Sequence, residues 1–194
     1  MERNAKMNEI PEIMTERLHL RGYRMEDAPE LVLIVNDKEI ASTTLRIPFP
    51  YALKDAEEWI LSTERKLVED SEINWAITNR FSNKLLGTIT LVLNKENGNA
   101  EFGYFIGKMF WGNGYCTEAA KAVLKFAFED LKLHRVHGSH MKKNLASAKV
   151  LLNIGMSYEG TQWGHIKKWD QFEDIVLYGM LKEDWDRLNS PAFK

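Results

Sequence analysis

Residues 110–119 read FWGNGYCTEA. One glycine stands on each side of an asparagine, and a run of good helix formers follows. An Asn-Gly pair is common in ordinary turns, so a plain connection is one interpretation. Here, however, the pair follows an extended segment and opens a long helix, whose first turn carries free N–H groups and a partial positive charge. Residues without bulk let an anion approach that backbone closely, which predicts a phosphate-binding loop.

Two common phosphate motifs do not match this stretch. The chain has no G-x-x-x-x-G-K-[ST] run, which a P-loop requires. The dinucleotide fingerprint G-x-G-x-x-G fits Gly112 and Gly114 but fails at Thr117, which takes the place of the third glycine. The strand expected before the loop also belongs to an antiparallel meander rather than to the start of a parallel unit.

The segments around the loop predict a mixed α/β (α+β) fold. Helical spacing of apolar residues predicts helices over 25–37, 54–70, 117–132 and 144–155. Extended patterns predict strands over 17–24, 73–80, 84–94, 99–107, 135–142, 157–166 and 174–181, with a turn at 95–98. We interpret residues 1–14 as a lead-in, 46–51 as a loop and the last residues as a charged tail. The order predicts a mixed, mostly antiparallel sheet of about seven strands, flanked by helices.

Composition narrows the classes of function. The 194 residues suit a single domain, and a net charge of −2 with a pI near 6.2 argues against direct nucleic-acid binding. Cys116 is the only cysteine, so no internal disulfide forms, which fits a reducing cytoplasm. The N-terminus lacks the pattern of a secretory signal, and no apolar run approaches the roughly 18 residues of a membrane span. We therefore expect a cytoplasmic protein without membrane contact.

The stretch 110–119 closely resembles the acyl-CoA loop of the GNAT acetyltransferases, in the RimJ/RimL-type branch of ribosomal-protein N-terminal acetyltransferases, where it reads W-G-x-G-Y-[AS]-T-E-A. Four further stretches resemble that branch in the same order. They are TERLHLRGYRMED (15–27), EFGYFI (101–106), NLASAKVLLNIGMSYEG (144–160) and EDIVLYGML (173–181). The resemblance covers about residues 15–181 and implies one GNAT domain over 1–194.

Three positions depart from the pattern of the branch or the wider family. Cys116 replaces a small Ala or Ser, and Met156 replaces a Phe. Leu151 stands where many GNAT enzymes outside this branch keep a tyrosine general acid. The acid must therefore be another residue, or the leaving thiolate needs little help.

The resemblance implies an N-acetyltransferase that moves an acetyl group from acetyl-CoA to a primary amine by direct attack in a ternary complex. The acceptor it implies is a protein N-terminal α-amine, such as that of a ribosomal protein, and self-association fits the branch. An acetyltransferase for small molecules, polyamines or antibiotics, is an alternative on the same fold. A CoA-binding sensor without turnover is a third hypothesis.

The resemblance also implies which residues hold acetyl-CoA. Backbone N–H groups of the loop would bind the pyrophosphate, and the strand end at 105–107 would splay from its neighbour and pair with the pantetheine arm. A backbone N–H there would polarise the thioester carbonyl. Thr117 would add a hydroxyl or cap the helix, and Asn144 would bond pantetheine or cap the next helix. The implied cofactor residues are Phe105, Ile106, Trp111, Gly112, Asn113, Gly114, Tyr115, Cys116, Thr117 and Asn144.

Two residues are implied to be catalytic. Ser147 resembles the serine that protonates the departing thiolate, and the alternative is a helix-surface serine without a role. Glu101 lies on the central strand where family members often place an acidic residue, which makes it a candidate for the base; a paired structural carboxylate is the equal alternative. Glu159 is a weaker second candidate for the base.

Other chemistry-bearing residues are interpreted as structural. Cys116 at a helix start suggests a nucleophile, but a small-residue role is favoured because no oriented His–acid pair is identifiable. His134, His137 and His140 do not suit zinc, because His137 faces away from the other two on a strand, so no metal is expected. Three tryptophans either border the acceptor groove or pack in the core: Trp59, Trp75 and Trp163.

Overall fold

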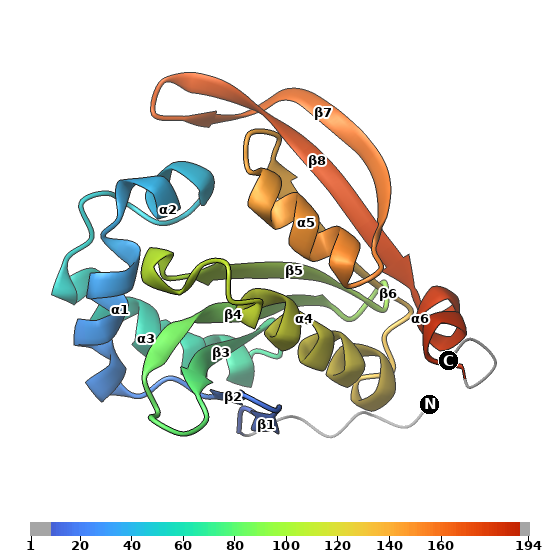
Figure 1. Ribbon diagram of the computed structural model, residues 1–194, viewed down its shortest axis with the longest axis horizontal. Coiled ribbons are helices and arrows are strands. Elements are labelled where there is room, and N and C mark those ends of the chain that lie inside the picture. The colour runs from blue at the N-terminus through green and yellow to red at the C-terminus, as the bar shows by residue number, and fades with distance from the viewer. Residues whose placement is uncertain (1–8, 191–194) are drawn as a thin grey trace.

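The computed structural model describes residues 9–190, so residues 1–8 and 191–194 of the predicted domain lie outside the described part. An eight-stranded sheet in the order β1-β2-β3-β4-β5-β6-β8-β7 runs through the molecule (Figure 1). Neighbouring strands are antiparallel except β5 and β6, which are parallel. The strands are β1 Ile13–Met14, β2 Leu18–Arg21, β3 Glu72–Asn79, β4 Leu85–Asn94, β5 Asn99–Ile106, β6 Arg135–Met141, β7 Ser157–Lys168 and β8 Gln171–Leu181.

The mixed, mostly antiparallel sheet is confirmed, with one strand more than the seven predicted. The extra strand, β1, has two residues and pairs with β2 inside the stretch interpreted as a lead-in. Two residues cannot show an alternating pattern, so sequence periodicity gave no sign of it.

Helices flank the sheet, and two of them were not predicted. The helical segments are η1 Met25–Asp27, α1 Ala28–Val35, α2 Lys38–Thr43, α3 Leu53–Val68, η2 Lys108–Phe110, α4 Tyr115–Lys125, the π-helical η3 Phe126–Asp130, α5 Leu145–Asn153 and α6 Lys182–Asn189. The unpredicted helices are α2 and α6. In α6, part of the supposed charged tail, Trp185 is the single buried anchor and stacks on Phe128 with ring centroids 5.6 Å apart. One apolar contact in eight residues leaves no helical stripe to detect.

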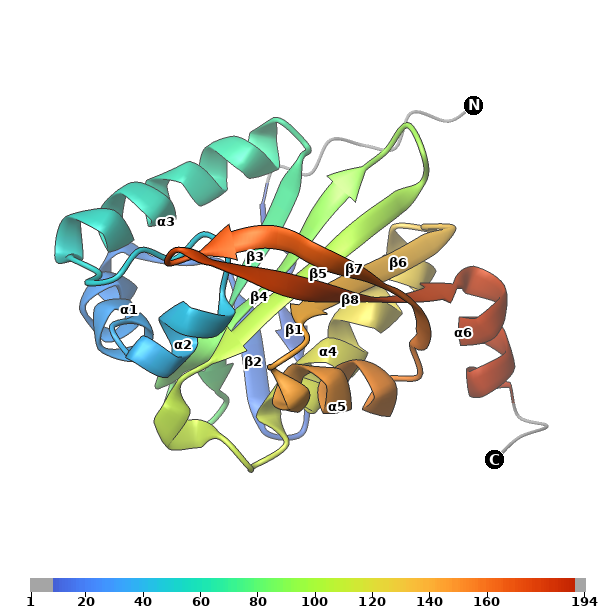
Figure 2. The same ribbon diagram turned by 90° about the horizontal axis from the view of Figure 1, so that it is seen from above.

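The two faces of the sheet carry separate cores. On β3, Ile73, Trp75 and Ile77 point to the face covered by α4, whereas Ala76 points to the face covered by α1 and α3. This is the alternation that a buried strand imposes. Figure 2 shows α1 and α3 on one side of the sheet and α4 and α5 on the other.

The parallel pair β5–β6 is the short junction of the sheet. It pairs only Asn99–Phe102 with Arg135–Gly138. Beyond these residues β5 continues along β4 as far as Ile106, and β6 continues along β8 as far as Met141. The second halves of β5 and β6 are therefore not paired with each other, as the family resemblance implied.

The β7–β8 hairpin extends beyond the rest of the sheet and reaches over toward the loop that precedes α3 (Figures 1 and 2). Two contacts join its tip to that loop. Lys168 Nζ donates to the backbone oxygen of Ile47 at 3.3 Å, and the Phe49 and Trp169 rings lie 6.3 Å apart. Across residues 9–190, no helix has both the length and the apolar character that crossing a membrane would need.

A buried ion pair ties β2 to η1. Arg21 donates to the two carboxylate oxygens of Asp27 at 2.7 and 2.8 Å, and the Arg24 N–H donates to the same carboxylate at 2.8 Å. Both side chains are almost completely buried. Removing one partner would leave the other charge without compensation in the interior.

We expect Asp27→Ala to lower the free energy of unfolding by about 3–5 kcal/mol, because it leaves the Arg21 guanidinium buried without its carboxylate partner. Urea denaturation measures this. The double variant Arg21→Met/Asp27→Leu should recover much of the loss, since neither charge remains. Asp186→Ala, which removes an exposed partner of Lys182, serves as the control and should cost less than about 1 kcal/mol. A loss at Asp27 no larger than at Asp186 would contradict the argument.

Candidate functional site

A cleft of about 1400 Å³ opens where β5 leaves β6. Its walls come from both faces of the sheet, including α5 and the start of α4 on one side and α3 with the loop before it on the other. The predicted site residues that line it are Glu101, Phe105, Ile106, Trp111, Gly112, Gly114, Tyr115, Cys116, Thr117, Asn144 and Ser147. Asn113 does not line it. The tertiary structure thus brings almost the whole predicted set into one place.

The glycine loop, residues 111–114, ends directly at the first turn of α4. Gly112 and Gly114 have φ angles of +77° and +75°, a left-handed conformation that favours glycine. The first bond of the helical ladder runs from the Glu118 N–H to the Gly114 carbonyl at 3.0 Å. The N–H groups of residues 115–117 therefore precede the ladder and are available to an anion in the cleft.

The structure adds a conformational reason for the two glycines to the predicted one, which was access for an anion. A Cβ on Gly112 would meet no atom within 4 Å, and one on Gly114 would meet only Arg17 Nη2, at 3.6 Å. Backbone conformation, rather than crowding within the protein, is what requires glycine here. Thr117 is not the helix cap, since Gly114 occupies that position and Thr117 lies three residues inside.

Arg17 and Thr15 anchor this loop from the edge of the sheet. The Glu118 carboxylate accepts hydrogen bonds from Thr15 Oγ1 at 2.6 Å, from the Arg17 N–H at 2.9 Å and from Arg17 Nε at 2.6 Å. Arg17 Nη1 also donates to the Asn113 carbonyl at 3.0 Å, and its guanidinium lies 4.7 Å from the centre of the Tyr115 ring. Thr15 and Arg17 belong to the stretch 15–27, and Glu118 belongs to the stretch 110–119. Two of the stretches that carry the family resemblance therefore contact each other directly.

The anchor sets the charge state of Glu118. Burial alone would raise the pKa of this carboxyl, but the hydrogen bonds from Thr15 and Arg17 outweigh burial and hold the pKa below its usual range. Glu118 is therefore ionised at neutral pH. Because the folded pKa lies below the unfolded one, this stabilisation is complete above the unfolded pKa and is lost as the pH falls through the folded pKa.

The open edge of β5 presents a limited set of backbone groups to the cleft. The Gly107 N–H donates to the Leu86 carbonyl of β4 at 2.8 Å, so it is not free. In an antiparallel pair every second residue bonds the same neighbour, which directs the Phe105 amide to β4 as well and leaves the Ile106 N–H facing the gap. The Ile106 carbonyl accepts from the Trp111 indole at 2.7 Å. Of the predicted strand end 105–107, only Ile106 has an N–H directed into the cleft.

Cys116 behaves as a small, half-buried residue. It packs against the α4-side core, and burial raises the pKa of its thiol to about 12. A thiol that remains protonated is a poor nucleophile. The interpretation of Cys116 as a small residue at the loop therefore fits the structure, and its position at the helix start does not activate it.

The start of α5 is joined to β5 through Tyr104, which sequence reasoning did not single out. The Asn144 side chain caps α5 by accepting from the Ser147 N–H at 3.1 Å. The Tyr104 hydroxyl lies 2.7 Å from Ser147 Oγ and donates toward the Ser147 carbonyl at 3.0 Å. An aromatic residue in the strand EFGYFI looks like a core residue, and only the folded chain shows that its hydroxyl reaches α5. Leu151, further along α5, is fully buried.

Glu101 sits at the last paired rows before β5 and β6 separate. Its cross-strand neighbours are Val92 on β4 and His137 on β6, and its side chain is exposed. Among residues 9–190 no hydrogen bond or ion pair to its carboxylate is found. Burial is the main cause that lowers the pKa of His137, partly opposed by the Glu101 charge, so His137 is neutral at pH 7.

Glu159, the second candidate for the base, forms an ion pair with Arg135. Its two carboxylate oxygens accept from Arg135 Nη1 and Nη2, each at 2.5 Å. The hydrogen bonds from Arg135 are the main cause of a lowered pKa, which makes Glu159 a weaker base. Of the two carboxylates considered for the base, Glu101 has the free oxygens.

The remaining histidines and tryptophans divide between core and surface. His140 is buried, stacks on Tyr178 and contacts the Met141 carbonyl through Nδ1 at 2.7 Å. Trp75 is fully buried, so of its two interpretations packing in the core is the one that holds. Trp59 lines the cleft, whereas Trp163 is exposed and lies under Lys142, whose Nζ is 4.1 Å from the ring centre.

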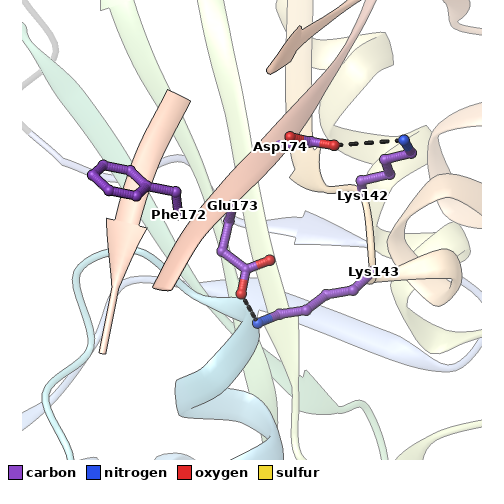
Figure 3. Close-up of a pocket in the computed structure, with 5 residues that line it drawn as sticks. All are labelled: Lys142, Lys143, Phe172, Glu173 and Asp174. Carbon is purple, nitrogen blue, oxygen red and sulfur yellow. Dashed lines mark hydrogen bonds and ion pairs between the residues drawn. The ribbon is translucent and has the colours of Figure 1, made fainter. Parts of the chain in front are cut away.

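A second, smaller hollow of about 340 Å³ lies between the β6–α5 connection and β8 (Figure 3). Its charged groups are paired with one another. Lys142 Nζ lies 3.5 Å from Asp174 Oδ2, and Lys143 forms an ion pair with Glu173. Phe172 completes its wall. The pairs fasten the β7–β8 hairpin next to Asn144 and leave no free group for chemistry.

We expect Glu118→Gln to lower the free energy of unfolding at pH 7 by about 1.5–3 kcal/mol, the usual contribution of hydrogen bonds to a charged group. The difference from the wild type should shrink as the pH falls below about 4.3, where the unfolded carboxyl becomes protonated and the wild type then loses its advantage. Thermal unfolding followed from pH 7 to pH 3 measures both effects. Glu129→Gln is the matched control, at an exposed position of η3 directly after α4. An unchanged difference at pH 3 would contradict the assigned charge state.

Comparison with known proteins gives the family. The family model described as acetyltransferase (GNAT) domain matches residues 17–157. The chain is 35% identical over 177 residues to the "Putative ribosomal N-acetyltransferase YdaF" of Bacillus subtilis (strain 168), covering 89% of this chain and 96% of that protein. It is 27% identical over 174 residues to the "Uncharacterized N-acetyltransferase p20" of Bacillus licheniformis, covering 89% of this chain and 97% of that one.

A solved structure agrees in fold. RimL, a ribosomal L7/L12 α-N-protein acetyltransferase in complex with coenzyme A, superposes with a TM-score of 0.81 at 16% identity, covering 88% of this chain and 98% of that chain. The family match spans the glycine loop, the splayed strands and the start of α5 described above. The chain therefore belongs to the GNAT acetyltransferase family and is an acetyltransferase.

Proposed function

We propose that this chain transfers the acetyl group of acetyl-CoA to the N-terminal α-amine of a protein, by direct attack of the amine on the thioester. The observation that carries the proposal is the single cleft between β5 and β6, which is lined from both faces of the sheet. Such a cleft accommodates two molecules that meet in its middle. No covalent intermediate on the enzyme is needed, and the protonated thiol of Cys116 does not offer one.

The residues of the cleft fit acetyl-CoA. The N–H groups of residues 115–117 and the left-handed glycines before them suit a diphosphate, because the helix start adds a partial positive charge. The unpaired edge of β5 suits the pantetheine arm, which carries amide groups able to add as an extra strand. The Ile106 N–H is the donor aimed at the place where the thioester oxygen gains negative charge. Asn144 keeps its Nδ2 available for pantetheine while its Oδ1 caps α5.

Glu101 is the proposed base. It lies next to the point where the strands separate, with unengaged oxygens and with neutral His137 beside it. An α-amine with a pKa of about 7.7–8.0 needs only about 1–1.4 kcal/mol to become neutral at pH 7, whereas a lysine near 10.4 needs about 4.6 kcal/mol. One exposed carboxylate, acting directly or through water, suits the first acceptor better than the second. Ser147 is proposed to face the departing sulfur from α5.

The relatives support the same class of acceptor. RimL is described as a ribosomal L7/L12 α-N-protein acetyltransferase, and YdaF is named as a putative ribosomal N-acetyltransferase. The chain is similar to both over nearly its whole length. A peptide N-terminus that enters beneath the β7–β8 hairpin would reach Glu101 from the face opposite the glycine loop.

We expect the purified chain to release CoA thiol when acetyl-CoA is mixed with peptides that have a free N-terminus. Mass spectrometry should place one acetyl group on the first residue. Peptides with a blocked N-terminus and an internal lysine are the matched control and should react far more slowly. Turnover of spermidine or an aminoglycoside alone would favour a small-molecule enzyme, and binding without any amine-dependent release would favour a sensor.

We expect Gly114→Val to weaken acetyl-CoA binding at least tenfold in calorimetry, because a β-branched residue resists the left-handed conformation and shifts the N–H groups of the first turn. Gly98→Val is the matched control. It strains a glycine with φ of +61° in the turn between β4 and β5, away from the cleft, and should lower stability without lowering affinity. Equal affinities of the Gly114 variant and the wild type, with both folded, would count against the loop as the pyrophosphate site.

A further inference from the structure

Ser147 is held at three of its atoms, more than a surface serine on a helix needs. Its N–H donates to Asn144, and its carbonyl and its hydroxyl both lie within hydrogen-bond distance of the Tyr104 hydroxyl, at 3.0 and 2.7 Å. Tyr104 comes from β5 at the open edge, and both side chains line the cleft. The contact spans the gap between the sheet and α5.

The two hydroxyl groups have only two hydrogens to share. In one arrangement Tyr104 donates to the Ser147 carbonyl, and the Ser147 hydroxyl donates back to the Tyr104 oxygen. In the other, Tyr104 donates to Ser147 Oγ, which leaves the Ser147 hydrogen free to point into the cleft. With an acceptor atom in the cleft, each arrangement has two hydrogen bonds, because the bond from Ser147 to the acceptor replaces the one from Tyr104 to the Ser147 carbonyl. An acceptor that gains negative charge favours the second arrangement, because a hydrogen bond to a charged atom is the stronger one. Donation by Tyr104 also polarises the Ser147 hydroxyl and strengthens its own bond.

We propose that Tyr104 is a positioning residue that turns the Ser147 hydroxyl toward the sulfur of acetyl-CoA, so that the pair stabilises the departing thiolate by a hydrogen bond. This inference rests on the function proposed above and adds Tyr104 to it. The ring of Tyr104 packs against Phe102 with centroids 5.4 Å apart, which restricts the direction of its hydroxyl.

The pair acts by hydrogen bonding rather than by proton transfer. Burial raises the pKa of Tyr104 well above its ordinary value, so its hydroxyl remains protonated, and a serine hydroxyl is a weaker acid still. A thiol has a pKa of only about 8.5, so moving a proton from either group to the thiolate would be uphill. The nitrogen forms the new C–N bond, the C–S bond breaks, and its electron pair leaves on sulfur. The amine proton passes to Glu101 or water, and the thiolate takes its own proton from solvent.

A double-mutant cycle tests the pairing. Single-turnover rates are measured at saturating acetyl-CoA and peptide for the wild type, Tyr104→Phe, Ser147→Ala and the double variant. We expect Tyr104→Phe to lower the rate about tenfold while acetyl-CoA affinity changes less than about twofold, since it removes one hydrogen bond that acts on developing charge. The double variant should be no slower than Ser147→Ala alone, because the two groups act as a unit.

A second readout separates this role from a merely structural one. With an acetyl-CoA analogue in which selenium replaces sulfur, the leaving group is more acidic and needs less stabilisation, so the loss in Tyr104→Phe should shrink. A distorted site would slow both thioester and selenoester equally. Tyr178→Phe is the matched control, a buried tyrosine on β8 outside the cleft, and should keep the wild-type rate.

The outcomes are distinguishable. A wild-type chain that binds acetyl-CoA but never transfers acetyl to any amine overturns the proposed function and this inference together. An active wild type with Tyr104→Phe at full rate, or with independent and multiplicative losses in the cycle, overturns only the role of Tyr104. Melting temperatures of all variants show whether any loss reflects unfolding.

Discussion

The separation of β5 from β6 is the constraint on which the rest of the structure depends. Four residues of each strand pair, and then each strand follows its other neighbour. A sheet interior normally satisfies both edges of every strand, so this gap leaves backbone groups of β5 without a partner in the sheet. The gap also connects the two faces of the sheet, which makes one cleft out of two surfaces. The proposed binding of the pantetheine arm and the proposed meeting of two reactants both depend on this opening.

Residues far apart in the chain hold the margins of the opening in place. On one side, Arg17 and Thr15 secure the glycine loop through the ionised Glu118. On the other, Asn144 and Tyr104 secure the start of α5. The hairpin tip reaches across to the loop before α3, and ion pairs hold it beside α5. Polar contacts therefore hold the elements around the cleft in place. This favours a site that is formed before the ligand binds over one that the ligand induces.

The charged side chains at and near the cleft differ in whether another side chain pairs with them. Glu159 and Glu118 are engaged with arginines, and the lysines of the second hollow are paired with acids. In the described part of the chain, residues 9–190, Glu101 has no partner, and it lies on the face of β5 opposite Phe102 and the glycine loop. In the function proposed above, that carboxylate receives the acceptor amine, and the helix start, with its partial positive charge, receives the anionic end of acetyl-CoA.

Local pattern determined most of the elements and the glycine loop, because alternation, helical spacing and a glycine pair at a helix start are visible within a few residues. The family and part of the cleft lining also followed from the sequence, since each resembling stretch is short and contiguous. Only the tertiary structure decided that Tyr104 reaches Ser147, that Glu118 binds Arg17, that Glu159 is occupied by Arg135 and that Gly107 is not a free donor. The partners of these contacts are separated by 24 to 101 positions, or depend on strand register, as Gly107 does. No local period carries such information, so packing of the folded chain alone settles which hydroxyl, carboxylate or amide remains available.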